Sequence, residues 1–408
     1  MEKPKIRFKG YQEDWEQRKL GELGSLKNGM NFSKEAMGVG YPFVNLQNIF
    51  GNNVIDVSDL GKAMASDSQL KDYNLINGDV LFVRSSVKLE GVGEAALVPQ
   101  TLENTTYSGF IIRFRDEYGL DNNFKRFVFG IDSVRNQIMS QATNSANKNI
   151  SQSVLENLEL AIPSKSEQQK IGAYFSNLDY LITLHQRKCE EMKTLKKYML
   201  QKMFPQNGQL VPQIRFSGFT EDWEQRKLDD VLKRRIEQRQ QSEEYPRLAF
   251  ASGQGVIPLS ERKTNNREQL TKDEYTKKYL VTELNDIVYN PANVKYGAID
   301  RNKCGRGLIS PIYVTFTTNE VPGFIERIVT SHDFQQRALR FEEGTVTKRQ
   351  SVNPEDLVTL DILVAPKREE QQKIATYFDS LDHLITLHQQ KCDELRNIKK
   401  FMLQNMFI

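Results

Sequence analysis

Residues 167–204 read EQQKIGAYFSNLDYLITLHQRKCEEMKTLKKYMLQKMF, and residues 370–407 read EQQKIATYFDSLDHLITLHQQKCDELRNIKKFMLQNMF. Twenty-five of these 38 positions are identical. A shorter string, EDWEQRKL, occurs at residues 13–20 and again at residues 221–228. The stretches between the repeats, about 21–150 and 229–350, do not resemble each other. The chain is a repeated frame with two different inserts, which suggests one molecule that recognises two different targets at a set distance.

Each long repeated segment predicts a helix that buries one side. Apolar or small residues recur at alternating steps of four and three, with one lapse at Lys196, which is a heptad pattern. At about 1.5 Å per residue each helix would be about 55 Å long. Two matching apolar seams in one chain favour an antiparallel coiled-coil pair, which would act as a spacer or as a dimerisation arm. The predicted core of this helix pair consists of Ile171, Phe175, Leu178, Ile182, His185, Cys189, Ile374, Phe378, Leu381, Ile385, His388 and Cys392.

The ends of the first helix also carry signals. Ser166 followed by Gln169 matches a capping box at the start, and Pro205 stops the helix at its end. Two histidines and two cysteines in the pair raise the question of zinc. In an antiparallel pair Cys189 and Cys392 would lie roughly 12 Å apart, too far for one tetrahedral ion. We therefore expect no metal and half-buried core residues.

Bulk properties describe an ordinary chain of two or three domains. The 408 residues include 38% hydrophobic and 27% charged residues. We expect no signal peptide and no membrane span, and three cysteines without a disulfide pattern favour the cytoplasm. The net charge of +3 is mild, and residues 21–150 hold 12 Lys/Arg against 14 Asp/Glu. Any DNA binding would need local clusters of charge or charge from partners.

Both inserts mix short β-like runs with turns and have one helical stretch near their ends, at residues 122–142 and 331–344. The fold class we predict is α+β, with two α/β recognition domains, a long antiparallel helix pair and a pseudo-twofold repeat. The predicted segments are a repeat segment 1–20, domain 1 at 21–165, helix 1 at 166–204, a linker and repeat segment 205–228, domain 2 at 229–368 and helix 2 at 369–408.

Catalytic motifs are not visible in the sequence. Adenine methyltransferases need an Asp/Asn/Ser-Pro-Pro-aromatic loop, and the nearest string, Asn290-Pro291-Ala292-Asn293, lacks the second proline and the aromatic residue. There is no GxxxxGK[ST] phosphate loop. Gly91-Val92-Gly93 favours a turn between strands, and Glu261-Arg262-Lys263 favours a solvated charge run. We expect neither catalysis nor a cofactor bound by this chain.

Polar loops with isolated basic residues are better candidates, because Arg pairs with guanine and Asn or Gln with adenine in the major groove. Solvated turn residues remain the alternative for each loop. The candidate DNA-binding residues are Arg84, Ser85, Ser86, Lys88, Asn147, Lys148, Asn293, Lys295, Tyr296, Lys348, Arg349 and Gln350.

The whole chain resembles the specificity subunit of type I restriction–modification enzymes. The resemblance rests on RFKGYQEDWEQRKLGEL and RFSGFTEDWEQRKLDDV, which open the two halves, and on AIPSKSEQQKIGAYFSNLDYLI and VAPKREEQQKIATYFDSLDHLI, which open the two helices. It implies that each domain recognises one half of a split site in double-stranded DNA and that the helix pair sets the gap. It also implies two methyltransferase subunits with S-adenosylmethionine, and a motor-nuclease subunit that uses ATP and Mg²⁺.

Two other classes of function stay open at this point. A coiled-coil adaptor with two protein-binding domains would show no DNA sequence preference. A self-sufficient methyltransferase or nuclease would act without partners, and the missing motifs argue against it.

Overall fold

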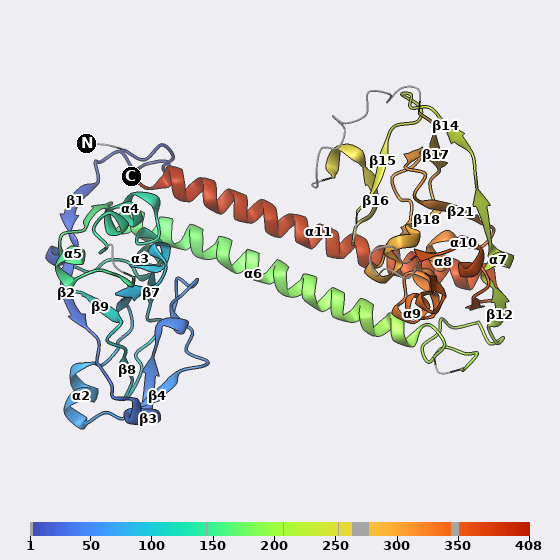
Figure 1. The fold of residues 1–408 in the computed structure, drawn as a ribbon. Coiled ribbons are helices and arrows are strands. Elements are labelled where there is room, and N and C mark those ends of the chain that lie inside the picture. Colours follow the sequence, from blue (N-terminus) through green and yellow to red (C-terminus); the bar gives the residue numbers. More distant parts are fainter. Residues whose placement is uncertain (1–2, 144–145, 207, 252, 263–276, 344–350) are drawn as a thin grey trace. The chain divides into compact units, whose positions relative to one another are not determined.

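The chain forms two compact units. Unit 1 contains residues 1–186 and 389–408, and unit 2 contains residues 187–388. The computed structural model describes residues 3–143, 146–206, 208–251, 253–262, 277–343 and 351–408. Two long helices, α6 (Lys165–Lys202) and α11 (Arg368–Met406), each contribute residues to both units (Figure 1). Within the described residues, no helix is long and apolar enough to cross a membrane.

Unit 1 is built on a four-stranded antiparallel sheet with the order β2-β9-β5-β7. A smaller sheet has the order β4-β3-β8, and the short pairs β1–β11 and β6–β10 complete the unit. Its strands are β1 (Glu16–Lys19), β2 (Gly24–Asn28), β3 (Met37–Val44), β4 (Gly61–Ala63), β5 (Val80–Val83), β6 (Ser85–Ser86), β7 (Ala95–Leu97), β8 (Thr106–Tyr107), β9 (Ile111–Asp116), β10 (Lys148–Asn149) and β11 (Glu159–Ile162). Its short helices are α1 (Leu20–Leu23), η1 (Lys34–Ala36), η2 (Leu46–Asn48), α2 (Asp67–Asp72), η3 (Leu89–Gly91), α3 (Asn122–Val128), α4 (Asp132–Ser140) and α5 (Gln152–Glu156).

Unit 2 repeats this plan with the sheet order β13-β21-β18-β19. The other pairings are β14-β17-β20, β15–β16, β12–β24 and β22–β23. Its strands are β12 (Glu224–Lys227), β13 (Leu232–Arg235), β14 (Gln238–Arg239), β15 (Leu248–Ala251), β16 (Gly255–Pro258), β17 (Tyr279–Thr282), β18 (Ile287–Tyr289), β19 (Ile299–Arg301), β20 (Gly307–Ile309), β21 (Val314–Thr318), β22 (Glu342–Glu343), β23 (Ser351–Val352) and β24 (Asp361–Val364). Its short helices are α7 (Leu228–Val231), η4 (Leu259–Glu261), η6 (Pro291–Tyr296), α8 (Pro322–Val329), α9 (His332–Ala338), η7 (Leu339–Phe341) and α10 (Pro354–Leu357).

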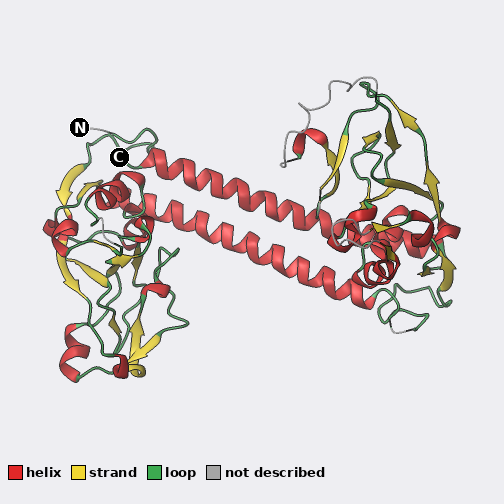
Figure 2. Cartoon of the chain, in the orientation of Figure 1, coloured by secondary structure: helices red, strands yellow, loops and turns green. Residues whose placement is uncertain are grey.

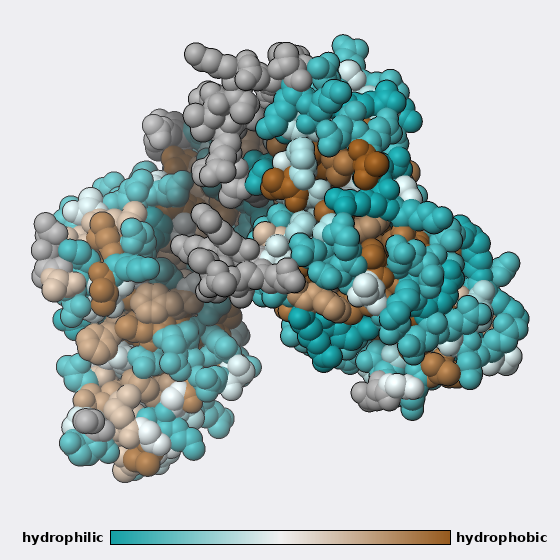
Figure 3. All heavy atoms as spheres, turned by 45° about the vertical axis from the view of Figure 1, so that its right-hand side comes forward, coloured by the Kyte–Doolittle hydropathy of each residue, from teal (hydrophilic) through white to brown (hydrophobic). Residues whose placement is uncertain are grey.

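The central strand of each sheet separates two hydrophobic cores. In β5, Val80 and Phe82 belong to the core that includes the long helices, whereas Leu81 and Val83 face a second core. A strand covered on both faces has no polar alternation, which explains the continuous VLFV run. The separate cartoon in Figure 2 shows this mixture of short strands and helices in both units. The visible surface in Figure 3 is largely hydrophilic, with local hydrophobic patches.

The repeated EQQ string fastens each domain to the start of its helix. Glu167 is fully buried and accepts hydrogen bonds from Nε and Nη2 of Arg7 at 2.7 and 2.8 Å. The side chain of Gln168 donates to the carbonyl of Pro163 and accepts from the backbone of Asp121. Unit 2 repeats both arrangements. Arg215 binds Glu370 at 2.7 and 2.8 Å, and Gln371 binds Ala365 and Val321.

The predicted capping box at Ser166 is wrong. Helix α6 begins at Lys165, and the backbone NH groups of Glu167 and Gln168 donate to the carbonyl of Ser164. Ser166 therefore lies inside the first turn. The carbonyl of Ser164 takes the place of the expected cap, and Glu167 and Gln168 are the buried residues of this first turn.

Each unit pairs α6 and α11 antiparallel. In unit 1, Lys399 binds Asp179, and Sγ of Cys392 lies 3.5 Å from the carbonyl oxygen of Ile182. In unit 2 the same contacts recur as Lys196 with Asp382 and Cys189 with Ile385. Each residue in the unit 1 contacts lies 203 positions away in the sequence from its counterpart in the unit 2 contacts. The predicted α+β class, the helix pair and the pseudo-twofold repeat are confirmed.

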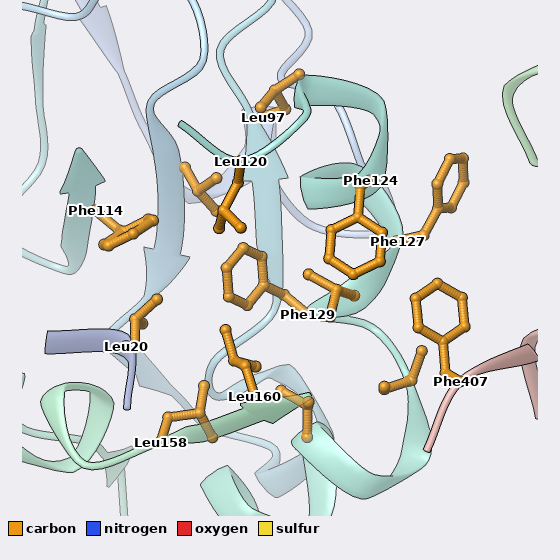
Figure 4. Packing of buried hydrophobic residues seen from close by; sticks show 14 of the residues in the cluster. Leu20, Leu97, Phe114, Leu120, Phe124, Phe127, Phe129, Leu158, Leu160 and Phe407 are labelled. Carbon is orange, nitrogen blue, oxygen red and sulfur yellow. The ribbon is translucent and has the colours of Figure 1, made fainter. Parts of the chain in front are cut away.

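The last turn of α11 completes the hydrophobic core of domain 1. Phe407 lies beside Phe124, with ring centroids 5.7 Å apart (Figure 4). Its ring centroid is also 5.8 Å from that of Phe175, and its ring lies edge-on to that of Trp15. In unit 2 the end of α6 has this position, because Phe204 packs against Trp223 and Phe324. Each domain is thus closed by the helix of the other repeat.

The predicted helical stretches needed two corrections. Residues 122–142 form two helices, α3 and α4, separated at Phe129–Ile131. In domain 2 a helix before the predicted stretch, α8, was missed, although Val321-Pro322 marks its start with proline in the first turn. Glu342–Glu343, predicted as helix, is strand β22 because it pairs with β23.

Candidate nucleic-acid interface

Domain 1 brings two of the predicted segments together. Strand β6 pairs antiparallel with β10, which sets Lys148 opposite Ser86 and Asn149 opposite Ser85. The NH of Ile150 also donates to the carbonyl of Arg84 at 3.0 Å. Two polar loops some sixty residues apart in sequence therefore form one surface.

The residues of this surface divide into supports and exposed groups. Arg84 is half-buried, and its guanidinium donates to the carbonyl of Gly109 at 3.4 Å, so it holds the neighbouring loop. The Oγ of Ser86 accepts from the NH of Lys88 and shapes the turn. Lys88 and Asn147 are exposed, and Lys148 is half-buried. Lys88 and Asn147 are thus the members placed to reach a ligand.

Domain 2 has a related surface at the equivalent place. The turn η6 contains Asn293, Lys295 and Tyr296, and it joins β18 to β19. The equivalent connection in domain 1 joins β5 to β7 and contains β6. Lys295 lies 3.6 Å from Glu342 of β22, and Tyr296 is exposed. Strands β22 and β23 flank the residues that contain Lys348, Arg349 and Gln350, and these three lie outside the described part of the chain.

The Asn290-Pro291-Ala292-Asn293 string is a capped turn. The buried Asn290 side chain accepts from the NH of Ala292 at 3.1 Å, and proline occupies the first position of η6. The Asn290 side-chain oxygen therefore supports the backbone of the turn.

A pocket of about 540 Å³ opens beside the paired loops of domain 1. Ser85, Ser86, Lys88 and Asn147, all predicted from sequence, line part of it. The rest is largely apolar and was missed by sequence reasoning. These additional lining residues are Leu46, Phe50, Val87, Glu90, Gly91, Glu94 and Phe110. Their apolar members, Leu46, Phe50, Val87 and Phe110, come from three separate segments of the chain, so only the assembled fold reveals them as one site.

Charges near the pocket are almost balanced. Glu94 accepts a hydrogen bond from the NH of Gly51, and Glu90 is exposed. Arg135 donates to the carbonyl of Glu90 at 2.7 Å, and burial lowers the pKa of its guanidinium. A site with so little net charge is better suited to the edges of bases than to phosphates.

Most of the predicted helix-pair residues are buried. Those near the start of each helix, such as Ile171, Phe175, Ile374 and Phe378, pack into the domain cores. Of the remainder, Leu178, Ile182, Cys189, Leu381 and Cys392 are buried, and His185, Ile385 and His388 are half-buried. In the described part of the chain, no group of three or more His, Cys, Asp or Glu residues could hold a metal ion.

The chain therefore consists of two domains of one topology, each fastened to a long helix of an antiparallel pair. A family model described as "Type I restriction modification DNA specificity domain" matches residues 12–194. The putative type I restriction enzyme MjaX specificity subunit of Methanocaldococcus jannaschii is 23% identical over 403 residues, which cover 95% of this chain and 91% of that protein. The EcoKI specificity subunit of Escherichia coli K12 is 29% identical over 151 residues, or 36% of this chain and 32% of that one.

Solved structures show the same fold along the whole chain. The crystal structure of the type I restriction–modification S subunit from M. genitalium has a TM-score of 0.63 at 15% identity and covers 100% of this chain and 99% of that one. A chain from work on complex assembly and conformational transition of the type I R-M system has a TM-score of 0.50 at 15% identity, with 97% of each chain covered. Over nearly its whole length the chain is thus similar in sequence to a type I restriction enzyme specificity subunit, its residues 12–194 match the specificity-domain model, and it has the fold of the solved S subunit.

Proposed function

We propose that this chain selects the DNA target of a type I restriction–modification complex, with each domain recognising one half of a bipartite site. The observation that carries the proposal is the repeated site. Both domains place a polar loop between the same two strands of the central sheet, β5 and β7 or β18 and β19. The segments before and after each insert repeat in the two halves of the chain, whereas the inserts that contain these loops differ. Two different sequence preferences on one scaffold follow naturally from this arrangement.

The chemistry of the loops suits the major groove. Lysine can donate to base edges that offer acceptors, and asparagine can pair with a base edge that offers a donor and an acceptor together. Domain 1 presents Lys88 and Asn147 for such contacts, and domain 2 presents Lys295 and Asn293. Tyr296 adds an exposed aromatic ring. Lys348, Arg349 and Gln350 stay part of the proposal for domain 2.

The helix surfaces support a pair of identical partners. In unit 1, Leu181, Ile398 and Phe401 are exposed large hydrophobic residues on the two helices. In unit 2, the residues at the matching positions, Leu384, Leu195 and Tyr198, are exposed as well. Exposed apolar residues on a helix face are typical of protein interfaces. One such set of exposed apolar residues per unit supports two methyltransferase subunits, one for each half-site.

Catalysis belongs to the partners in this proposal. The methyltransferase subunits supply S-adenosylmethionine, and a motor-nuclease subunit uses ATP with Mg²⁺. This chain itself binds none of these cofactors, and the complex acts on DNA in the cytoplasm. In this proposal the helix pair sets the length of the unread spacer of the target.

Domain exchange tests the assignment. The complex would be produced with its methyltransferase subunits, and methylated adenines would be mapped across a genome. Replacement of residues 21–150 by the same region of another specificity subunit should change one half-site and leave the other intact. The reciprocal exchange of residues 229–350 is the matched control and should change only the second half. A swap that changes both halves, or neither, would contradict the proposal.

A further inference from the structure

The pocket of domain 1 exposes apolar side chains in a place where a polar surface would be expected. Val87 is 78% exposed, Phe110 is 57% exposed and Phe50 is 38% exposed. All three line the same pocket as Ser85, Ser86 and Asn147. Exposed apolar groups that converge on one pocket usually have a partner.

The floor of this pocket has no side chain. A Cβ built on Gly91 would lie 2.5 Å from Oγ of Ser86 and 3.1 Å from Cε1 of Phe50. Glycine therefore keeps open the space between the serine hydroxyl and the phenylalanine ring. The result is a pocket with an apolar wall of Phe50, Val87 and Phe110 and a polar edge of Ser85, Ser86 and Asn147.

The edges of base pairs offer few apolar groups to such a wall. In the major groove, guanine, cytosine and adenine present hydrogen-bond donors and acceptors, and thymine adds its C5-methyl group. Phenylalanine and small apolar side chains are suited to contact that methyl. The pocket is lined by one cation, Lys88, and two carboxylates, Glu90 and Glu94, which also disfavours a phosphate as the occupant.

We propose that this pocket recognises the 5-methyl group of one thymine in the half-site of domain 1, through Phe110 and Val87. This inference rests on the proposed function and adds the chemical feature that domain 1 detects. The polar edge then contacts the same or a neighbouring base pair through Asn147 or a serine hydroxyl.

Uracil substitution tests the inference directly, because uracil differs from thymine only by this methyl. Each thymine of the mapped half-site, on either strand, would be replaced singly by uracil, and binding of the assembled complex would be measured. Loss of one buried methyl contact should weaken binding about three- to tenfold at one position. The Phe110→Ala complex should bind the thymine and uracil duplexes nearly equally.

Two further variants complete the test. Val87→Ala, at the most exposed wall residue, should also reduce the thymine-to-uracil ratio and covers the case in which Phe110→Ala misfolds. Val57→Ala alters a residue that is as exposed as Phe50 but does not line the pocket, so it should retain the wild-type ratio.

The outcomes separate this inference from the proposed function. If the unmodified target binds no better than a scrambled duplex, the proposed function fails. If the target is preferred but no uracil affects binding, or both wall variants keep the full ratio, the thymine inference alone is overturned. A Phe110→Ala variant that loses its methyltransferase subunits in the absence of DNA would show a protein-binding pocket and would equally overturn it.

Discussion

The buried ion pair between Arg7 and Glu167 provides a sharp test of how unit 1 is fastened. The carboxylate is inaccessible to solvent and holds the guanidinium through two hydrogen bonds of 2.7 and 2.8 Å. Glu167→Ala would leave the guanidinium, 13% exposed, without its counter-charge. Breaking a buried pair from one side costs about 3–5 kcal/mol in the free energy of unfolding. For a unit of about 200 residues, this lowers the thermal midpoint by roughly 6–20 °C.

The two tryptophans allow the two units to be followed separately. Trp15 is buried in unit 1 and Trp223 in unit 2. In a Trp223→Phe background, fluorescence on heating or in denaturant reports unit 1, and Glu167→Ala should shift this transition. In the reverse Trp15→Phe background the shift should be much smaller. The twin variant Glu370→Ala should show the opposite pattern.

Controls decide whether the buried charge is the cause. Replacing both Arg7 and Glu167 by methionine should restore most of the loss, because two apolar groups can replace a buried pair at little cost. Glu190→Ala breaks a surface pair with Lys193 and should change the stability by less than about 1 kcal/mol. A loss below about 1 kcal/mol for Glu167→Ala, or an equal loss for the double variant, would refute the reasoning.

Two further outcomes are expected. Burial raises the pKa of Asp300, so its ionised form costs stability at neutral pH, and this cost is lost as the pH falls through the raised folded-state pKa. The Asp300→Asn variant should therefore unfold at a higher denaturant concentration than the wild type at pH 7, and at a similar concentration near pH 4. An equal difference between variant and wild type at both pH values would argue against burial as the cause. Insertion of one heptad into each long helix, between residues 186 and 187 and between residues 388 and 389, keeps the seam in register and adds about 10 Å. Methylation mapping should then show the same half-sites with a spacer about three base pairs longer, and an unchanged spacer in an active complex would mean that contacts among the partners set the distance.

Much of the frame could be predicted from the sequence because it is written twice. The heptad spacing of Phe175, Leu178 and Ile182 in the first helix recurs in the second, and a 3.6-residue period leaves few alternatives. The buried roles of Glu167 and Gln168 could not be predicted. Charged and amide residues on the first turn of a helix are expected to face solvent. Their partners, Arg7 and the backbone of Asp121, are distant in the sequence and become known only from the fold.

The candidate site was less accessible to sequence reasoning. The loop residues Ser86 and Lys148 were chosen independently, and nothing local shows that β6 and β10 pair. Phe110 was missed because one aromatic residue beside a strand is typical of a core residue. Its 57% exposure depends on the turn after β8, which only the assembled fold determines. The missed helix α8 has a similar cause, since its run of buried residues has the composition of a strand.

The closure of domain 1 by the last turn of α11 has a consequence for synthesis on the ribosome. Residues 389–408 belong to unit 1, yet residue 408 is made 222 residues after residue 186. At about 5–20 residues per second this interval lasts roughly 10–45 s. Unit 2 consists of one continuous segment, residues 187–388. All residues of unit 2 are therefore synthesised before residues 389–408, which complete unit 1, although domain 2 follows domain 1 in the sequence. During that interval the faces of Phe124 and Phe175 that Phe407 later covers lack this partner, and transiently exposed apolar surface of this kind favours aggregation.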